Sequence, residues 1–217
     1  MALASDTATL PGNVKVTRQD WLDAAMETLI SDGSDQVKIL TLANRMNVSR
    51  SSFYWYFKDR QDLLAALLDH WMSTNTRAIV AAADLPADTV TGAVSNVFRA
   101  FIDPRQFHVK LDFAVRDWSR RSPEIRHVLE ASDGQRVEAL ARLFRRYGYS
   151  EKESLTRARV LYYMQIGYND ADLQEAMEDR MELYALYLKT FTGRDAPKAE
   201  VDDFRDYAMT LARELGV

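Results

Sequence analysis

Apolar residues recur along most of the chain with the three- and four-residue spacing of an α-helix, and this pattern predicts an all-α fold. A first helix is expected to begin at Thr17 and to end at Gly33, a residue type that often terminates helices. Further short helices are expected over 39–46 and 49–57. The three-residue link 47–49 between them predicts a helix-turn-helix.

The rest of the chain is expected to form longer helices, over 59–83, 87–102, 104–118, 123–147, 150–168, 171–191 and 197–215. The helix over 59–83 is apolar in its first half and polar at 73–76, which fits a connecting helix that leaves one small core and enters another. Pro86 marks the break that follows. We therefore divide the chain into a disordered arm (1–13), a helix-turn-helix domain (14–60), a connecting helix (61–83) and a C-terminal domain (84–217).

Composition and charge narrow the function. The chain has no cysteine, which excludes disulfides and thiolate metal sites and favours a cytoplasmic protein. The longest apolar run, 78–83, is too short to span a membrane, and residues 1–13 lack the basic start and apolar centre of a secretory signal. The formal net charge is −4, yet residues 45–60 contain four basic side chains and one acidic side chain. An acidic body with one basic edge suits a protein that presents a single surface to nucleic acid.

The helix expected over 49–57 has two chemically different faces. Phe53 and Phe57 lie four residues apart and are expected in the core, whereas Arg50 shares the other face with aromatic rings. An α-helix fits the major groove of DNA, where a guanidinium near its start grips guanine at two points. A plain surface helix is the alternative, but the three consecutive aromatic residues 54–56 cannot all face one core.

We expect Arg50 to read a base edge and Tyr56, Lys58 and Arg60 to hold phosphates. Lys38, just before the helix over 39–46, is expected near a phosphate, and its alternative is a solvated loop lysine. The residues expected to bind DNA are Lys38, Ser49, Arg50, Ser51, Ser52, Tyr54, Trp55, Tyr56, Lys58 and Arg60.

These motifs resemble the N-terminal pattern of the TetR family of bacterial repressors. That pattern has a first helix ending at Gly, an apolar Leu-Ala in the second helix, and a recognition helix of the form Val-Ser-x-x-x-x-Tyr-x-x-Phe before a basic residue. Here it reads as Asp32-Gly33, Leu42-Ala43, Val48-Ser49 through Tyr54 and Phe57, and then Lys58 and Arg60. The resemblance covers about residues 17–68, with Tyr56 where many members have His and Arg60 where Lys is usual. Both replacements still donate to phosphate.

The resemblance implies an effector cavity among the C-terminal helices, where this chain carries many aromatic rings. Plain core packing is the alternative for such rings, and His108 and Asp112, one helical turn apart, are alternatively bonded to each other. The effector is expected to be an apolar or aromatic small molecule with one polar group. The residues expected to line its cavity are Trp71, Asn75, Phe98, Phe101, Phe107, His108, Asp112, Trp118, Tyr162, Tyr163 and Gln165.

The helix expected over 171–191 is apolar on two faces, which predicts that one faces the chain's own core and the other a second copy of the chain. A deeply buried helix is the alternative. A two-fold dimer places two recognition helices in successive major grooves and so reads a palindrome. The residues expected at the dimer interface are Leu173, Met177, Met181, Tyr184, Tyr187 and Leu188.

Together these observations predict a homodimeric repressor that a small molecule releases from a palindromic DNA operator. A regulator that binds DNA constitutively or with a protein partner is the second possibility. Glu124 and His127 form a Glu-x-x-His step like that of di-iron helical enzymes, but the sequence has no second copy of it. We therefore expect no enzyme activity, no cofactor and no metal.

Overall fold

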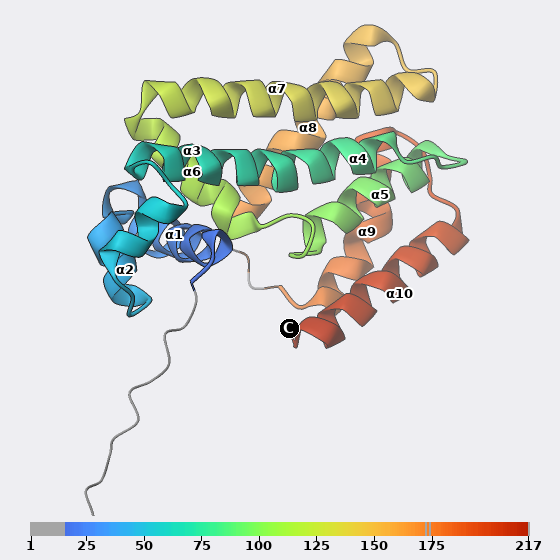
Figure 1. The fold of residues 1–217 in the computed structure, drawn as a ribbon. Coiled ribbons are helices and arrows are strands. Elements are labelled where there is room, and N and C mark those ends of the chain that lie inside the picture. The colour runs from blue at the N-terminus through green and yellow to red at the C-terminus, as the bar shows by residue number, and fades with distance from the viewer. Residues whose placement is uncertain (1–15, 172, 174, 217) are drawn as a thin grey trace, which may run out of the picture.

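The computed structural model describes residues 16–171, 173 and 175–216, and Figure 1 shows that this part of the chain is built from helices. It contains no strand among the described residues, as the sequence predicts. The expected disordered arm, residues 1–13, lies outside the described residues. None of the helices in the described ranges has the length and apolar character needed to cross a membrane.

The N-terminal module consists of α1 (Arg18–Asp32), η1 (Ser34–Gln36), α2 (Ile39–Arg45) and η2 (Arg50–Trp55). Thr17 caps α1 through a capping box with Asp20, because each side chain binds the other residue's backbone N–H. The helix ends at Gly33, whose φ of 83° is unfavourable for any residue with a Cβ. The predicted start and end of this helix are therefore confirmed.

A long helix runs from Arg60 to Asp84 and connects the two ends of the molecule (Figure 1). It comprises α3 (Arg60–Trp71), η3 (Met72–Thr76) and α4 (Arg77–Asp84), and η3 is wound as a π-helix. The sequence predicts one helix here, and the structure adds the π-helical turn in its polar middle. Such turns occur mostly as single insertions within α-helices and often lie at functional sites.

The C-terminal helices are α5 (Val90–Ile102), α6 (Val109–Arg121), α7 (Pro123–Arg146), α8 (Glu151–Asp170), α9 (Met177–Thr192) and α10 (Lys198–Leu215). Several begin later than predicted. Thr89 caps α5 by accepting from Gly92 N, and His108 caps α6 by accepting from Leu111 N. The prediction that α9 begins near residue 171 is wrong, since α9 begins six residues later. The predicted cap of α7, Ser122 followed by Pro123, is confirmed.

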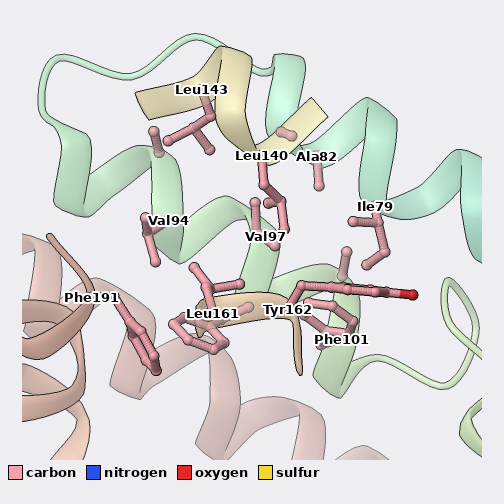
Figure 2. Close-up of a cluster of buried hydrophobic side chains, with 14 of the residues drawn as sticks. Ile79, Ala82, Val94, Val97, Phe101, Leu140, Leu143, Leu161, Tyr162 and Phe191 are labelled. Carbon is pink, nitrogen blue, oxygen red and sulfur yellow. The ribbon is translucent and has the colours of Figure 1, made fainter. Parts of the chain in front are cut away.

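Two apolar clusters fill the molecule. The C-terminal cluster joins α4, α5, α7, α8 and α9, and Figure 2 shows Ile79, Val97, Leu140 and Leu161 meeting from four of these helices. The N-terminal cluster packs around Trp21 and Phe53, whose rings meet edge to face with centroids 5.2 Å apart. The N-terminal cluster also takes in side chains of α6 and α7. The helix-turn-helix is therefore fixed directly to the C-terminal domain as well as to the long helix.

Candidate DNA-binding surface and effector cavity

The predicted recognition helix is present, but η2 is wound as a 3-10 helix rather than as an α-helix. The turn before it is tight, because Asn47 is left-handed with φ of 53° and Val48 N donates to Ala43 O at 2.9 Å. Ser49 caps η2 by accepting from Ser51 N at 3.1 Å. Short helical pieces commonly take 3-10 winding. The helix-turn-helix is confirmed, and the expected α-helical winding of its second helix is wrong.

The two faces of η2 are as predicted. Phe53 and Phe57 are buried, while Arg50, Tyr54 and Trp55 are exposed. The Arg50 Nη2 donates to the Tyr54 hydroxyl at 3.1 Å, which orients the guanidinium along the outer edge of the element. Trp55 is 84% exposed. Because this indole lies largely in water, it contributes little hydrophobic stabilisation to the folded chain. A partner that covers the indole would therefore gain the free energy of burying its apolar surface.

Two side chains expected at phosphates have partners inside the protein. The Tyr56 hydroxyl donates to Val16 O at 2.6 Å. The Arg60 Nε donates to Val37 O and its Nη2 donates to Ser34 O, each at 2.6 Å. These bonds tie the segment before α1 and the loop around η1 to the recognition element. Tyr56 and Arg60 therefore hold η2 in place against the rest of the N-terminal module, a role that the sequence does not reveal.

The other residues expected to bind DNA lie outside the apolar core. Lys38 and Lys58 are exposed on either side of the helix-turn-helix, and the three serines 49, 51 and 52 lie at the start of η2. The Ser52 hydroxyl donates to Ser49 O at 2.6 Å, so this serine stabilises the turn. Phosphate contacts by the two lysines remain a prediction.

Three residues expected to line an effector cavity, Trp71, Asp112 and Tyr162, take part in a buried network at the junction of the two apolar clusters. Asp112 accepts from Trp71 Nε1 at 2.8 Å, from Arg136 Nη1 at 2.9 Å and from Arg116 Nε at 2.9 Å. Burial opposes ionisation of Asp112, but the two guanidinium groups outweigh it and hold the pKa of this carboxyl below its ordinary value. Asp112 is therefore an ionised centre of the network.

The network reaches the long helix and α7 through Arg136, which is fully buried. Its Nε and Nη2 donate to Thr76 Oγ1 at 3.2 and 3.0 Å, and the Thr76 hydroxyl is 2.6 Å from the Ser132 hydroxyl. The sequence does not reveal the role of Arg136, because an arginine within an amphipathic helix pattern is usually solvated.

The network reaches α8 through Tyr162. Its hydroxyl donates to Asp133 Oδ1 at 2.7 Å and accepts from Arg136 Nη1 at 3.1 Å and Arg116 Nη2 at 2.9 Å. Arg116 also donates to both oxygens of Asp133 at 3.1 and 2.9 Å. Burial raises the pKa of Tyr162, which keeps the phenol protonated. Two arginines and two aspartates thus balance in charge. Trp71, Asp112 and Tyr162 hydrogen-bond within this network, and their contact with an effector stays a prediction.

Other residues expected to line the effector cavity also bind or pack at other places in the chain. Asn75 pairs with the backbone of His108, donating to its O at 3.0 Å and accepting from its N at 3.1 Å. The His108 Nδ1 accepts from Leu111 N at 3.1 Å, so the alternative bond between His108 and Asp112 is wrong. Burial lowers the pKa of His108. Trp118 packs in the N-terminal cluster, and Tyr163 is 52% exposed.

A cavity of about 60 Å³ does exist, but it lies farther from the DNA-binding module, between α5, α8, α9 and α10. Five aromatic side chains line it, and these are Phe98, Tyr168, Tyr184, Tyr187 and Phe204. The remaining lining side chains are Ile102, Met164, Gln165, Arg180 and Met181. Phe98 and Gln165 were expected there, whereas Phe101 and Phe107 pack in the C-terminal cluster outside it.

The dimer prediction needs correction in α9. Met181, Tyr184 and Leu188 are buried in the chain's own core, so they cannot contact a partner. Met177 and Tyr187 are half-buried, and Leu173 is exposed. Exposed apolar side chains of α8 and α9 include Val160, Tyr163, Leu183 and Leu186. The sequence pattern identifies two faces of the helix, and the structure buries the face that carries Met181, Tyr184 and Leu188 in the chain's own core.

Comparison with known proteins agrees with the geometry of the N-terminal module. Residues 22–67 match the model of the bacterial regulatory proteins of the tetR family. The HTH-type transcriptional regulator TtgW of Pseudomonas putida is 33% identical over 54 residues, a match that covers 25% of this chain and 40% of that relative. The similarity thus spans less than half of the relative's length.

Solved structures resemble the chain over most of its length. The fatty acid degradation regulator FadR of Bacillus halodurans has a TM-score of 0.58 at 17% identity, covering 82% of this chain and 97% of that one. AmtR of Mycobacterium smegmatis has a TM-score of 0.58 at 16% identity, covering 96% and 97%. At such identities the likeness shows a shared fold. The helix-turn-helix within residues 22–67 is therefore the DNA-binding module of the TetR type of bacterial regulatory protein.

Proposed function

We propose that the chain is a cytoplasmic homodimeric repressor that binds a palindromic operator and is released by a small molecule. The observation that carries the DNA part is the exposed face of η2, where Arg50, Tyr54 and Trp55 point away from a core made by Phe53 and Phe57. Arg50 reads a base edge in the major groove, and Lys38 and Lys58 contact phosphates on either side.

Selection from a random-sequence duplex library followed by fluorescence anisotropy tests this assignment. Arg50→Ala is expected to weaken the selected site by about 1–3 kcal/mol and to relax preference at one position per half-site. Lys58→Ala is expected to weaken all sequences alike and to reduce the salt slope by about 1. Lys152→Ala, on an exposed position of α8, is the matched control. Unchanged base preference in Arg50→Ala would remove η2 from the reading role.

The dimer is proposed to form through the outer face of α8 and α9, defined by Val160, Tyr163, Leu183 and Leu186. Leu186 is 61% exposed, and an apolar set of this size on adjacent helices suits a self-complementary two-fold interface. Leu186→Glu is expected to give monomers in sedimentation velocity and to lose operator affinity. Leu85→Glu, an exposed leucine outside this face, is the control. A dimeric Leu186→Glu protein would move the interface elsewhere.

Release by a small molecule is supported by the aromatic-lined cavity between α5, α8, α9 and α10. One observation favours the alternative of a regulator without small-molecule control, because the cavity measures only about 60 Å³. A mobility-shift screen of small aromatic compounds against the selected operator decides between them. Release by at least one compound, lost on filling the cavity with Met164→Trp, supports the repressor; no release by any compound supports the alternative.

A further inference from the structure

The lining of the cavity between α5, α8, α9 and α10 has a defined chemistry. Half of its side chains are aromatic, and among the described residues that line it Arg180 alone carries a charge. The Arg180 Cζ lies 5.0 Å from the centre of the Tyr168 ring, which holds the guanidinium against an aromatic face. The lining therefore presents flat apolar surfaces beside one fixed cation.

Charges of both signs surround the cavity, with Arg99, Glu200 and Asp203 near Tyr184, whereas its lining carries the cation Arg180. The Arg205 Nη2 donates to Met181 O at 3.5 Å behind the lining. The nearby carboxylate of Glu175 accepts from the Tyr168 hydroxyl, and burial together with this bond raises the pKa of Tyr168 to about 12, so the phenol stays neutral. Arg180 is thus the ionic group that a ligand meets inside the cavity.

The cavity is too small for a ring as it stands. Its volume is about 60 Å³, whereas a cavity that holds benzene measures about 150 Å³. Two of its walls differ in how readily they yield. Tyr184 stacks on Phe204 with ring centroids 4.0 Å apart, which joins α9 firmly to α10. Met164 and Met181 are unbranched and adjust easily to a new neighbour.

We propose that this cavity binds an aromatic carboxylate by widening between α8 and α9. The carboxylate pairs with Arg180, and the ring takes the space between Met164, Met181 and the aromatic walls. Arginine suits this role because its planar group binds both oxygens of a carboxylate. The proposal rests on the proposed function in that the ligand serves as the effector.

The same helix links this site to the proposed dimer face. Met181 and Tyr184 face the cavity on the inner side of α9, while Leu183 and Leu186 lie on its outer side. Because the empty cavity cannot hold a ring, a bound ring moves α9, and the outer side moves with it. The ligand therefore changes the proposed dimer face, and with it the distance between the two DNA-binding modules. The buried network at the junction keeps each DNA-binding module fixed to its C-terminal domain during this movement.

Calorimetric titration of the full-length protein with three probes of equal shape tests the ligand class. The probes are 2-naphthoate, neutral 2-naphthalenemethanol and cationic 2-naphthylmethylammonium. We expect 2-naphthoate to bind about tenfold more tightly than the alcohol, and the cation to bind most weakly. Equal affinity for acid and alcohol, or tightest binding of the cation, would overturn the assignment of an anionic ligand.

Variants locate the binding. Arg180→Gln is expected to make the acid and the alcohol bind equally, while Arg77→Gln, on an exposed position of α4, keeps the tenfold difference. Arg180→Lys keeps the charge and is expected to retain part of the difference, which serves if the glutamine variant does not fold. Met164→Ala enlarges the cavity and is expected to tighten 2-naphthoate binding. Binding that none of these variants alters would place the probe elsewhere.

Operator mobility shift with 2-naphthoate is measured separately. If 2-naphthoate binds tightly through Arg180 but does not release the operator, the result supports the carboxylate site. The same result overturns the role of this site as the effector site. Release of the operator together with loss of release in Arg180→Gln supports both. Absence of binding, with operator release by an uncharged compound, overturns the ligand class and leaves the repressor intact.

Discussion

The junction network and the cavity lie on the same helix, α8, but they are built in opposite ways. At the junction, Tyr162 joins two arginines and two aspartates whose charges balance and whose bonds are short. One to two turns farther along α8, Gln165 and Tyr168 line a cavity that is also walled by methionine side chains and aromatic rings. One site is rigid because any shift breaks several ionic hydrogen bonds at once, and the other yields because methionine side chains adapt. A ligand-controlled regulator needs a site that deforms when the ligand binds. It also needs a rigid connection that carries the resulting movement to the DNA-binding module.

The strongest test of the rigid junction is Arg136→Ala. This change leaves Asp112 buried with one ionic partner fewer, and we expect it to lower the free energy of unfolding by about 3–5 kcal/mol. Urea denaturation followed by circular dichroism measures it. The double variant Arg136→Met with Asp112→Asn removes the uncompensated charge and is expected to recover much of the loss. A single variant as stable as the parent chain would show that the network contributes no rigidity.

Truncation of apolar side chains compares how strongly the C-terminal cluster and the cavity contribute to the free energy of unfolding. Leu140→Ala opens a hole in the close-packed C-terminal cluster and is expected to cost about 3–5 kcal/mol. Met181→Ala enlarges an existing cavity whose walls adjust, so we expect about 2 kcal/mol. The same denaturation curves report both values. Equal losses would mean that the cavity is as tightly packed as the cluster.

The pH dependence of stability tests the ionic character of the junction. The pKa of Asp112 lies below its ordinary value in the folded chain, so its stabilising contribution is complete above the unfolded pKa of about 3.9 and is lost as the pH falls through the folded pKa. Each unit of that lowering corresponds to about 1.4 kcal/mol. The difference in unfolding free energy between the parent chain and Asp112→Asn is therefore expected to stay constant from pH 7 to pH 5. Below about pH 4 it should narrow, and a difference that widens there contradicts the assignment.

The smallest expected effect is that of Trp71→Phe. It removes the Nε1 donor to Asp112 but keeps an aromatic ring in the N-terminal cluster, so a loss of about 1–2 kcal/mol is expected. Operator affinity measured beside stability shows whether this bond also transmits the effector signal. We expect DNA binding to persist while effector release weakens, because Trp71 joins the long helix to α6.

The periodicity of the sequence predicts most of the helices because each turn places the same face inward, as Phe53 and Phe57 show. It does not predict which neighbour a face meets. Trp118 has the pattern of a cavity residue but packs on the DNA-binding module, and Met181 has the pattern of an interface residue but faces inward. The arginine Arg136 is invisible to such reasoning, since its burial depends on Asp112, 24 positions away along the chain. Long-range pairing of charges is a property of the fold.

The π-helical turn at Met72–Thr76 has a consequence for how the connecting helix meets its neighbours. A π-turn holds one residue more than an α-turn, so the extra residue is taken up within one widened turn and the α-helical segments before and after it keep a common axis. Within this turn, Asn75 pairs with the backbone of His108, and the Thr76 hydroxyl accepts from Arg136 of α7. Deleting one residue here would narrow the turn and change the direction of these two side chains. The extra residue therefore sets which side chains of the connecting helix reach the junction between the two apolar clusters.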